Sequence, residues 1–254
     1  MAIDSNAATT LAVTTNDDAI IDKARAIAEQ LHLPFVEDGA DLPWALILST
    51  DQLALRFPGA KNPFVVNFLQ SSYERRLQQA SRNKEPLARA IGLKFGVACH
   101  VLDGTAGWGS DAVLLAKLGA RVTAIERSPV VAALLADGVR RLKKKACYTT
   151  LDIQIEVADT QEYIKKNDIP LPDVIYLDPM FPERPNNAQV KKSMQLLQLL
   201  IGTSPDVELL AKTAFTVCPR LVIKRPEWAQ PIMKNPTYSI PAGIVRFDVY
   251  IRTK

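Results

Sequence analysis

Acidic residues and glycines in the middle of the chain have the spacing of a nucleoside-binding site. An apolar run ends at Asp103 and leads into a turn with three glycines: Gly104, Gly107 and Gly109. This pattern predicts a buried parallel strand and a tight turn whose backbone can approach a ligand closely. A second short strand ends at Glu126, where a carboxylate can accept both hydroxyl protons of an adenosyl ribose. Together these residues predict a nucleoside cofactor.

The order of the glycines bears on which cofactor binds. A glycine turn after a strand is common to dinucleotide-dependent dehydrogenases and to methyltransferases. Here the order is Gly-x-x-Gly-x-Gly after Asp103, rather than the Gly-x-Gly-x-x-Gly that brings a helix N-terminus to a pyrophosphate. A carboxylate there would repel a diphosphate and suits the cationic aminoacyl end of S-adenosylmethionine. The turn therefore favours S-adenosylmethionine, although Asp103 would also serve as a turn-capping residue.

Further positions extend the predicted cofactor site. Ser110 and Asp111 open the helix after the glycine turn, where N-cap and first-turn residues stabilise a helix with or without a ligand. Asp159 and Thr160 follow the third predicted strand, where side chains would contact the amino group and the ring edge of an adenine. A cofactor role and a purely structural role are equally favoured at these last two positions.

The segment Asp178-Pro179-Met180-Phe181-Pro182, after the fourth predicted strand, indicates the reaction. It resembles the Asp/Asn-Pro-Pro-aromatic loop of methyltransferases that act on exocyclic amines. Such an amine on a purine is a poor nucleophile because its lone pair is delocalised into the ring. Asp178 and the Pro179 carbonyl can accept its two hydrogens and aim the lone pair at a sulfonium methyl group, while Phe181 stacks on an extruded base. This chemistry needs no metal, and a rigid proline turn is the structural alternative.

Basic residues near this loop predict contacts with RNA phosphates. Arg184 follows the loop, and Lys224 and Arg225 lie at the end of the predicted strand 219–224, where the ligand site of such a sheet lies. Lys191 and Lys192 fit a solvated helix face better.

Strand and helix patterns alternate from residue 97 onward. The predicted strands are 97–103, 121–126, 152–157, 173–178, 219–224 and a late strand at 243–252. The predicted helices are 110–118, 129–143, 160–166, 188–201 and 206–214. This alternation implies a doubly wound, Rossmann-like α/β sheet of the class I S-adenosylmethionine-dependent methyltransferase type, with ligands outside the carboxyl ends of its strands.

The first 70 residues follow a different pattern. A helix that begins near Asp17 precedes short apolar runs at 44–48, 53–57 and 64–68, which resemble a small antiparallel appendage. We therefore predict two domains, a small N-terminal α+β appendage at 1–70 and a methyltransferase domain at 71–254.

The segment at 72–94 that follows is mostly helical in pattern and basic, and it predicts an RNA-facing bridge between the two domains. Its cations are Arg75, Arg76, Arg82, Lys84 and Arg89.

Composition excludes several classes of protein. The chain of 254 residues is 48% hydrophobic and 23% charged, which suits a folded domain with a full core. A net charge of +4 requires that any affinity for nucleic acid come from a local basic face. Three separated cysteines and two histidines suggest neither a disulfide framework nor a zinc site. We expect a cytoplasmic protein without a membrane span.

Longer segments resemble one family, the bacterial ribosomal small-subunit RNA guanine-N2 methyltransferase J family. The likeness runs from about residue 86 to 252 and rests on DGTAGWGSDAVLLAKLGARV, IERSPVVAALLADG, DVIYLDPMFPER, VIKRPEWAQP and RFDVY. It implies methylation of a guanosine N2 in 16S ribosomal RNA or the small ribosomal subunit, with S-adenosylmethionine as donor. The cofactor contacts that it implies are Ser110, Asp111, Glu126, Arg127, Asp159, Thr160 and Asp178.

The chain departs from this family's pattern at several of its positions. The family usually has Arg at position 110, Ala at 104, Leu at 108 and a serine pair at 159 and 160. It also has glycines before the first glycine-turn strand, which 78–85 lacks.

The sequence leaves other interpretations of the function open. The same loop chemistry serves amines in DNA and the amide of a protein glutamine. A nucleotide-linked dehydrogenase would use the same sheet, and a catalytically silent RNA-binding protein is a further alternative.

Overall fold

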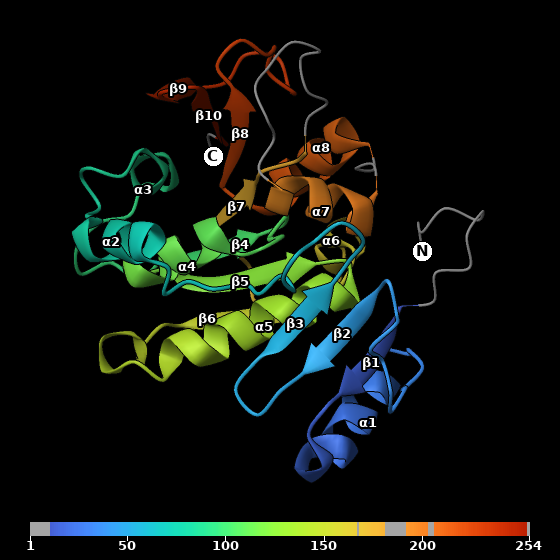
Figure 1. Ribbon diagram of the computed structural model, residues 1–254. Helices are drawn as coiled ribbons and strands as arrows, with labels where there is room; N and C mark the ends of the chain where they lie inside the picture. The colour runs from blue at the N-terminus through green and yellow to red at the C-terminus, as the bar shows by residue number, and fades with distance from the viewer. Residues whose placement is uncertain (1–10, 167, 181–191, 203–205, 253–254) are drawn as a thin grey trace.

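The computed structural model describes residues 11–166, 168–180, 192–202 and 206–252. Within these ranges, seven strands form the central sheet in the spatial order β6-β5-β4-β7-β8-β10-β9 (Figure 1). The strands from β6 to β8 are parallel, and β10 runs antiparallel to both of its neighbours. Their bounds are β4 (His100–Asp103), β5 (Arg121–Glu126), β6 (Ile153–Val157), β7 (Val174–Leu177), β8 (Arg220–Pro226), β9 (Tyr238–Ala242) and β10 (Val245–Ile251).

This order places the change of winding direction at β4. After β4 the chain continues to β5 on one side, and it returns later to β7 on the other side. Ligands of doubly wound sheets bind outside the carboxyl ends of the strands at such a switch point. Asp103 ends β4 and Asp178 follows β7 directly, so the fold brings both predicted site residues to this edge.

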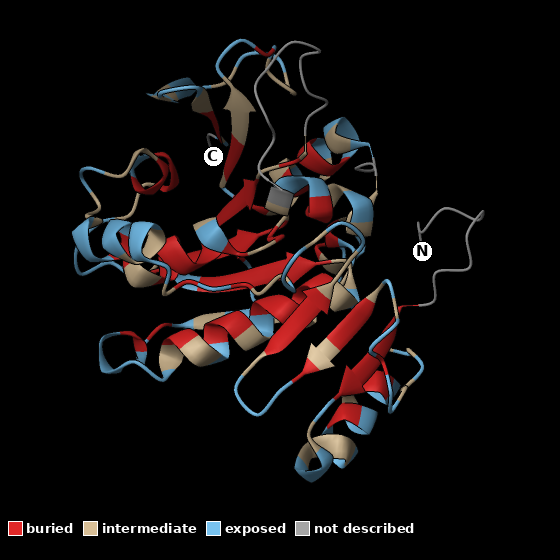
Figure 2. Ribbon diagram, in the orientation of Figure 1, coloured by how far each residue is buried: buried red, intermediate tan, exposed pale blue. Residues whose placement is uncertain are grey.

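Helices cover both faces of the sheet, because successive side chains of a strand point to opposite faces. Val101 and Tyr176 belong to one buried cluster with α4 and α5, whereas Leu102 and Leu177 belong to a second cluster with α8. Figure 2 shows the central strands as almost continuously buried, as expected for a parallel sheet covered on both faces. The helices are α4 (Ser110–Lys117), α5 (Pro129–Lys143), α6 (Thr160–Tyr163), α7 (Lys192–Ile201) and α8 (Val207–Val217), with the 3-10 turn η2 (Ala146–Tyr148).

The predicted alternation from residue 97 onward is confirmed, apart from the ends of the elements and one strand. The structure adds β9, which sequence patterns missed. This strand is mostly exposed and contains Pro241, and an edge strand tolerates a proline because one side of its backbone has no partner strand. Its polar composition hid it among the surrounding turns.

The N-terminal unit is a small sheet with a covering helix. In the described chain its strand order is β1-β2-β3, with β1 parallel to β2 and β2 antiparallel to β3. Its elements are β1 (Ala12–Thr15), the 3-10 turn η1 (Asp18–Ile20), α1 (Ile21–Gln30), β2 (Ala45–Leu48) and β3 (Leu53–Arg56). The prediction of a purely antiparallel appendage was therefore wrong, because α1 serves as the crossover that a parallel pair requires.

The strand predicted at 64–68 was also wrong. Phe64 forms one isolated bridge with Leu55, and the rest of the segment packs against α5. The Val66 carbonyl accepts a hydrogen bond from Arg141, and a side chain at Gly138 would lie 2.7 Å from the same oxygen. The backbone of this segment is thus used for docking onto a helix rather than for extending a sheet.

The two units share one buried core. Leu55, Val66 and Phe68 of the N-terminal unit belong to the same cluster as Leu135 of α5, and the blue sheet lies beside α5 in Figure 1. The domain boundary near residue 70 stays a prediction. Two helices, α2 (Ser71–Gln79) and α3 (Pro86–Ile91), follow it and confirm the helical pattern of that segment. No helix in the described ranges is long and apolar enough to cross a membrane.

Candidate active site

The glycine positions of the turn after β4 leave no room for a side chain. A Cβ at Gly104 would lie 2.7 Å from Thr160 Cγ2, and one at Gly109 would lie 2.2 Å from Leu135 Cδ1. Gly109 has φ +76° and is itself the N-cap of α4, so Ser110, a predicted N-cap candidate, is the first residue of the helix instead. The turn is therefore built from backbone that packs closely, with its N–H groups near the end of β4.

Asp103 lies at the base of this turn and is 2% exposed. Its Oδ1 accepts a hydrogen bond of 3.1 Å from the Thr105 N–H, so the turn-capping role occurs. The pKa of Asp103 is raised to about 8, chiefly by burial; the bond from Thr105 and the charge of Lys224 oppose this rise, and the neighbouring Asp111 and Asp178 add to it. A buried carboxyl with this pKa gains from a bound cation, because the cation offsets the loss of hydration.

Glu126, at the end of β5, stabilises the glycine turn through hydrogen bonds. Its Oε2 accepts a 3.0 Å hydrogen bond from the Gly107 N–H, and its Oε1 accepts a 2.8 Å bond from the Ser128 N–H. Burial raises the pKa of Glu126, and these two bonds oppose the rise. Each carboxylate oxygen retains a second lone pair, so Glu126 can hold the turn and still accept ribose hydroxyl protons.

The other predicted cofactor positions have structural partners as well. Asp159 caps α6 through the N–H groups of its first turn, at 2.8 and 3.2 Å. The Thr160 hydroxyl donates a 2.5 Å bond to the Gly104 carbonyl, which joins the start of α6 to the glycine turn. Arg127 donates to the Ile201 carbonyl at the end of α7. Their cofactor roles stay predictions.

A half-buried ion cluster lies where β7, β8 and α4 meet. The Lys224 Nζ is 2.7 Å from Asp178 Oδ2 and 3.1 Å from Asp111 Oδ2. The Tyr176 hydroxyl donates a 2.7 Å bond to that same Asp111 oxygen. Residues that are distant in sequence are thus joined through one ammonium group.

These contacts set the protonation of the cluster. Burial alone would raise the pKa of Asp111, but Lys224 and the Tyr176 hydrogen bond bring it below the usual range. Burial raises the pKa of Asp178, and Lys224 only partly offsets that rise. Although burial disfavours a charged lysine, the two carboxylates raise the pKa of Lys224 well above its ordinary value. Lys224 therefore stays protonated throughout the physiological range.

The loop that begins at Asp178 is attached to the glycine turn. The Asp178 N–H donates a 2.5 Å bond to the Thr105 hydroxyl, and Pro179 is buried directly after it. Phe181 and Arg184, predicted to stack on a base and to contact phosphate, lie outside the described residues, as does Lys191.

The structure changes the surroundings expected for the basic residues. The Lys224 ammonium is paired with carboxylates of the site, and the Arg225 guanidinium donates to the Gln230 carbonyl at 2.9 and 2.5 Å. Arg82 donates a 2.6 Å bond to the Leu118 carbonyl and so supports the loop after α4. Phosphate contacts by Lys224 and Arg225 stay predictions.

Sequence patterns missed one aromatic residue of the site, Tyr176, and left open whether Trp108 packs beside the cofactor or covers the glycine turn. The sequence pattern predicts Tyr176 as a core residue of a buried strand. Only its hydroxyl group, within an otherwise aliphatic segment, indicates that it needs a polar partner. Trp108 lies in the glycine turn, where its indole N–H donates a 2.9 Å hydrogen bond to the Ser193 carbonyl of α7. The centroid of its ring lies 4.5 Å from that of Phe64. Trp108 thus links the turn to α7 and to the N-terminal unit.

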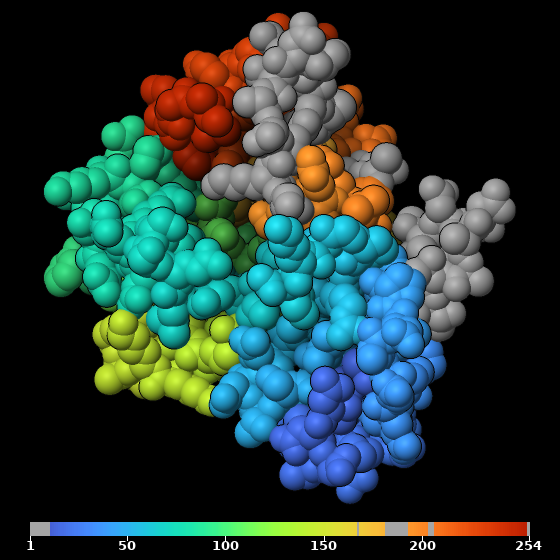
Figure 3. Space-filling view, in the orientation of Figure 1, coloured from blue at the N-terminus to red at the C-terminus, as the bar shows by residue number. Residues whose placement is uncertain are grey.

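This arrangement fits S-adenosylmethionine. Close-packed glycine backbone can approach the nucleoside, Glu126 can accept ribose protons, and buried Asp103 can face the cationic aminoacyl end. Figure 3 shows a hollow at this edge of the sheet, with green atoms recessed between the teal surface of 71–94 and the cyan surface before it.

Comparison with known proteins agrees with this geometry. Residues 26–252 match the model of a SAM-dependent methyltransferase family. A SAM-dependent methyltransferase of Neisseria gonorrhoeae has a solved structure with a TM-score of 0.72 and 28% identity, covering 94% of this chain and 95% of the other. These matches confirm the predicted class I methyltransferase fold and S-adenosylmethionine as cofactor.

Two relatives are named ribosomal RNA small subunit methyltransferase J. The one from Thioalkalivibrio sulfidiphilus is 38% identical over 96% of this chain and 98% of its own length. The one from Alkalilimnicola ehrlichii is 41% identical over 89% of this chain and 90% of its own length. The chain therefore belongs to the ribosomal RNA small subunit methyltransferase J family of SAM-dependent methyltransferases.

Proposed function

We propose that the protein transfers a methyl group from S-adenosylmethionine to the exocyclic N2 amine of a guanosine in 16S ribosomal RNA of the small ribosomal subunit. The observation that carries this proposal is the position of Asp178 and Pro179 at the end of β7, beside the glycine turn and hydrogen-bonded to it at 2.5 Å. The names of the relatives support the RNA substrate.

Asp178 and Pro179 prepare the amine. When bound, S-adenosylmethionine supplies an electrophilic methyl group on a sulfonium. The Asp178 carboxylate and the Pro179 carbonyl each accept a hydrogen bond from one of the two N–H groups of the amine, which favours a pyramidal nitrogen with its lone pair free to attack. As the N–C bond forms, the bond between the sulfonium and the methyl group breaks and leaves S-adenosylhomocysteine; the nitrogen then carries one proton too many, and Asp178 accepts it. The raised pKa of Asp178 suits this acceptance.

Lys224 positions the Asp178 carboxylate. Its ammonium holds Oδ2 at 2.7 Å, so the other oxygen remains to face the amine. The second contact, to Asp111 at 3.1 Å, anchors the ammonium to the first turn of α4. Much of the rate enhancement would come from such positioning.

An Asp178→Asn variant tests the proposed reaction. Small ribosomal subunits that lack the modification are incubated with methyl-labelled S-adenosylmethionine, and the labelled nucleoside is identified after digestion. We expect N2-methylguanosine at one site with the wild-type protein, and a loss of at least a hundredfold in turnover, about the contribution of a general base, in the variant.

The binding of S-adenosylmethionine to the variant serves as the control and should stay within a few fold of wild type. Full activity of Asp178→Asn would contradict the assigned role. Label in DNA or in a protein glutamine, with none in RNA, would move the activity to the other amine and amide substrates.

A further inference from the structure

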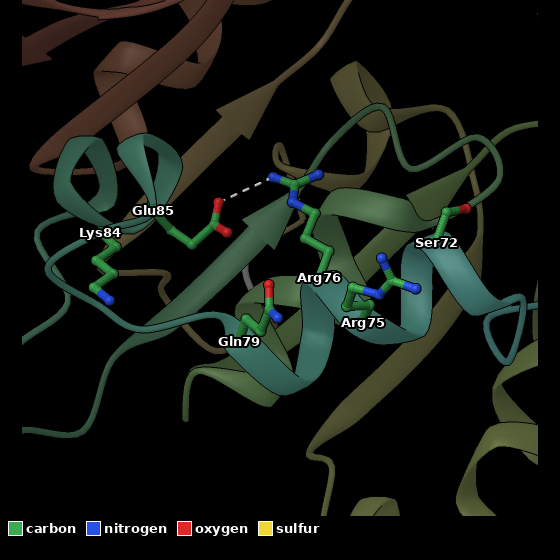
Figure 4. Close-up of a pocket in the computed structure, with 6 residues that line it drawn as sticks. All are labelled: Ser72, Arg75, Arg76, Gln79, Lys84 and Glu85. Atoms are coloured by element: carbon green, nitrogen blue, oxygen red, sulfur yellow. Dashed lines mark hydrogen bonds and ion pairs between the residues drawn. The ribbon is translucent and has the colours of Figure 1, made fainter.

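We propose that the groove between α2 and α3 binds phosphates of the RNA substrate next to the active site, an inference that rests on the proposed function. The groove has a volume of about 670 Å³ and opens to solvent on the basic segment between the two units. The described residues that line it are Ser72, Arg75, Arg76, Gln79, Lys84 and Glu85 (Figure 4).

The charges of the groove suit a polyanion. Arg75 and Lys84 are exposed, and neither makes an ion pair within the part of the chain that the structure describes. Arg76 pairs with Glu85 at 3.0 Å, and its side chain is still 45% exposed. Arginine presents a planar fork that matches two phosphate oxygens, and lysine adds a point charge. The lining therefore combines available cations with polar groups rather than with an apolar docking face.

The groove is connected to the reacting edge of the sheet. On the same helix, the Tyr73 hydroxyl donates to the carbonyl of Ser110, the first residue of α4. Arg76 is close enough to Asp111 for its charge to add to the lowering of that carboxyl's pKa, after Lys224 and Tyr176. Asp111 in turn shares Lys224 with Asp178. A strand of RNA held in the groove would thus have its neighbouring nucleotides beside the amine-binding loop.

A local site of this kind is needed because the whole molecule carries only a modest positive charge. At a net charge of +4, long-range attraction to a ribosomal subunit is weak, and affinity must come from particular phosphate contacts. The teal surface of 71–94 forms one wall of the hollow in Figure 3.

The test is a double variant, Arg75→Ala with Lys84→Ala. We expect the KM for small ribosomal subunits to rise by tenfold or more, with kcat and the Kd for S-adenosylmethionine unchanged. The slope of log Kd for 16S ribosomal RNA against log salt should fall by roughly 1.4 to 1.8, because each lost phosphate contact removes about 0.7 to 0.9. A merely structural role would not change this slope.

A matched control removes two exposed cations elsewhere. Lys23 of α1 and Lys212 of α8 are exposed, and their helices lie far from α2 in Figure 1. The pair Lys23→Ala with Lys212→Ala should leave both the KM and the salt slope at wild-type values.

A further variant should act in the opposite direction. Glu85→Gln frees Arg76 from its ion pair, so the Kd for RNA should fall. Glu85 makes no side-chain capping bond to α3, so the helix start should tolerate the change.

The outcomes separate this inference from the proposed function. An unchanged salt slope and KM in the Arg75→Ala, Lys84→Ala variant would overturn the proposal that the groove binds RNA. A variant that lost more affinity for an acidic peptide than for RNA would overturn it as well. RNA binding requires no methyl transfer, so the salt slope tests the groove alone. The nucleoside labelled by the wild-type protein tests the reaction alone.

Discussion

At the scale of the residue, strand ends were the informative positions. Asp103, Glu126 and Asp178 could be predicted as site residues because a buried strand followed by an acid places that acid at the ligand edge of a parallel sheet. The pairing of Lys224 could not be predicted. It joins carboxylates 113 and 46 residues away, and only the register of β8 in the sheet brings them together. Long-range ion pairs leave no mark in a local pattern.

Lys224 gives a prediction about pH dependence. Because Lys224 lowers the pKa of Asp178, its removal in Lys224→Gln should raise that pKa and move the acidic limb of the kcat profile to higher pH. Turnover should fall by roughly a hundredfold, the lower range for a group that assists proton transfer. Lys224→Arg keeps the charge and should leave the limb in place. Superimposable profiles for the wild type and Lys224→Gln would count against a positioning role.

Asp103 gives a prediction about stability. Its pKa is raised to about 8, chiefly by burial, whereas an unfolded chain has the ordinary value near 3.9. Between these values the folded protein holds the extra proton, so its stability without ligand falls as pH rises from about 4 to 8. Asp103→Asn keeps the acceptor for Thr105 and removes this dependence. Urea midpoints across this range should diverge between the two proteins, and parallel curves would refute the assignment.

At the scale of the element, regular patterns were predictable and irregular backbone was not. The alternation of apolar strands and amphipathic helices identified the strands of the central sheet apart from β9, because the inner strands are buried on both faces. The segment 64–68 misled because its apolar residues are those of a strand, yet its backbone is used by α5 through Arg141 and Gly138. Hydrophobic periodicity predicts which side chains are buried, but it does not predict which groups the backbone of the segment contacts.

Alanine substitutions at two glycines with the same φ allow the cost of backbone strain to be separated from the cost of overpacking. One of these glycines lies in the glycine turn and the other does not. Gly59 and Gly109 both have φ +76°, but a Cβ at Gly59 has nothing within 4 Å, whereas one at Gly109 would meet Leu135 at 2.2 Å. Gly59→Ala should cost about 1 to 2 kcal/mol for the left-handed backbone. Gly109→Ala should cost a further 1 to 3 kcal/mol from overpacking and weaken binding of S-adenosylmethionine. Equal losses in urea unfolding would show that the turn relaxes.

At the scale of the whole molecule, the two predicted domains have a common core. Leu55 and Leu135 belong to one buried cluster although they come from different units, and Phe64 reaches the ring of Trp108 in the glycine turn. A boundary can be predicted from a change of pattern, but sharing of a core depends on which faces meet in space. The appendage is thus part of the support of the cofactor turn.

This shared core predicts one cooperative unfolding transition. Trp44 reports on the N-terminal unit and Trp228 on the end of the central sheet, so two variants that each retain one of them as the fluorophore can be compared. Their urea midpoints should coincide, as expected for a two-state protein. An earlier transition at Trp44 would mean that the N-terminal unit unfolds by itself.

The docking of 64–68 on α5 also has a consequence during synthesis. The N-terminal sheet leaves the ribosome first, but the helix that covers Val66 ends at Lys143, about 75 residues later. At ordinary elongation rates this delay is on the order of ten seconds. Throughout that time the nascent chain exposes Leu55, Val66 and Phe68, all buried in the finished protein. We therefore expect the nascent chain to bind chaperones that recognise exposed apolar segments until α5 has been translated.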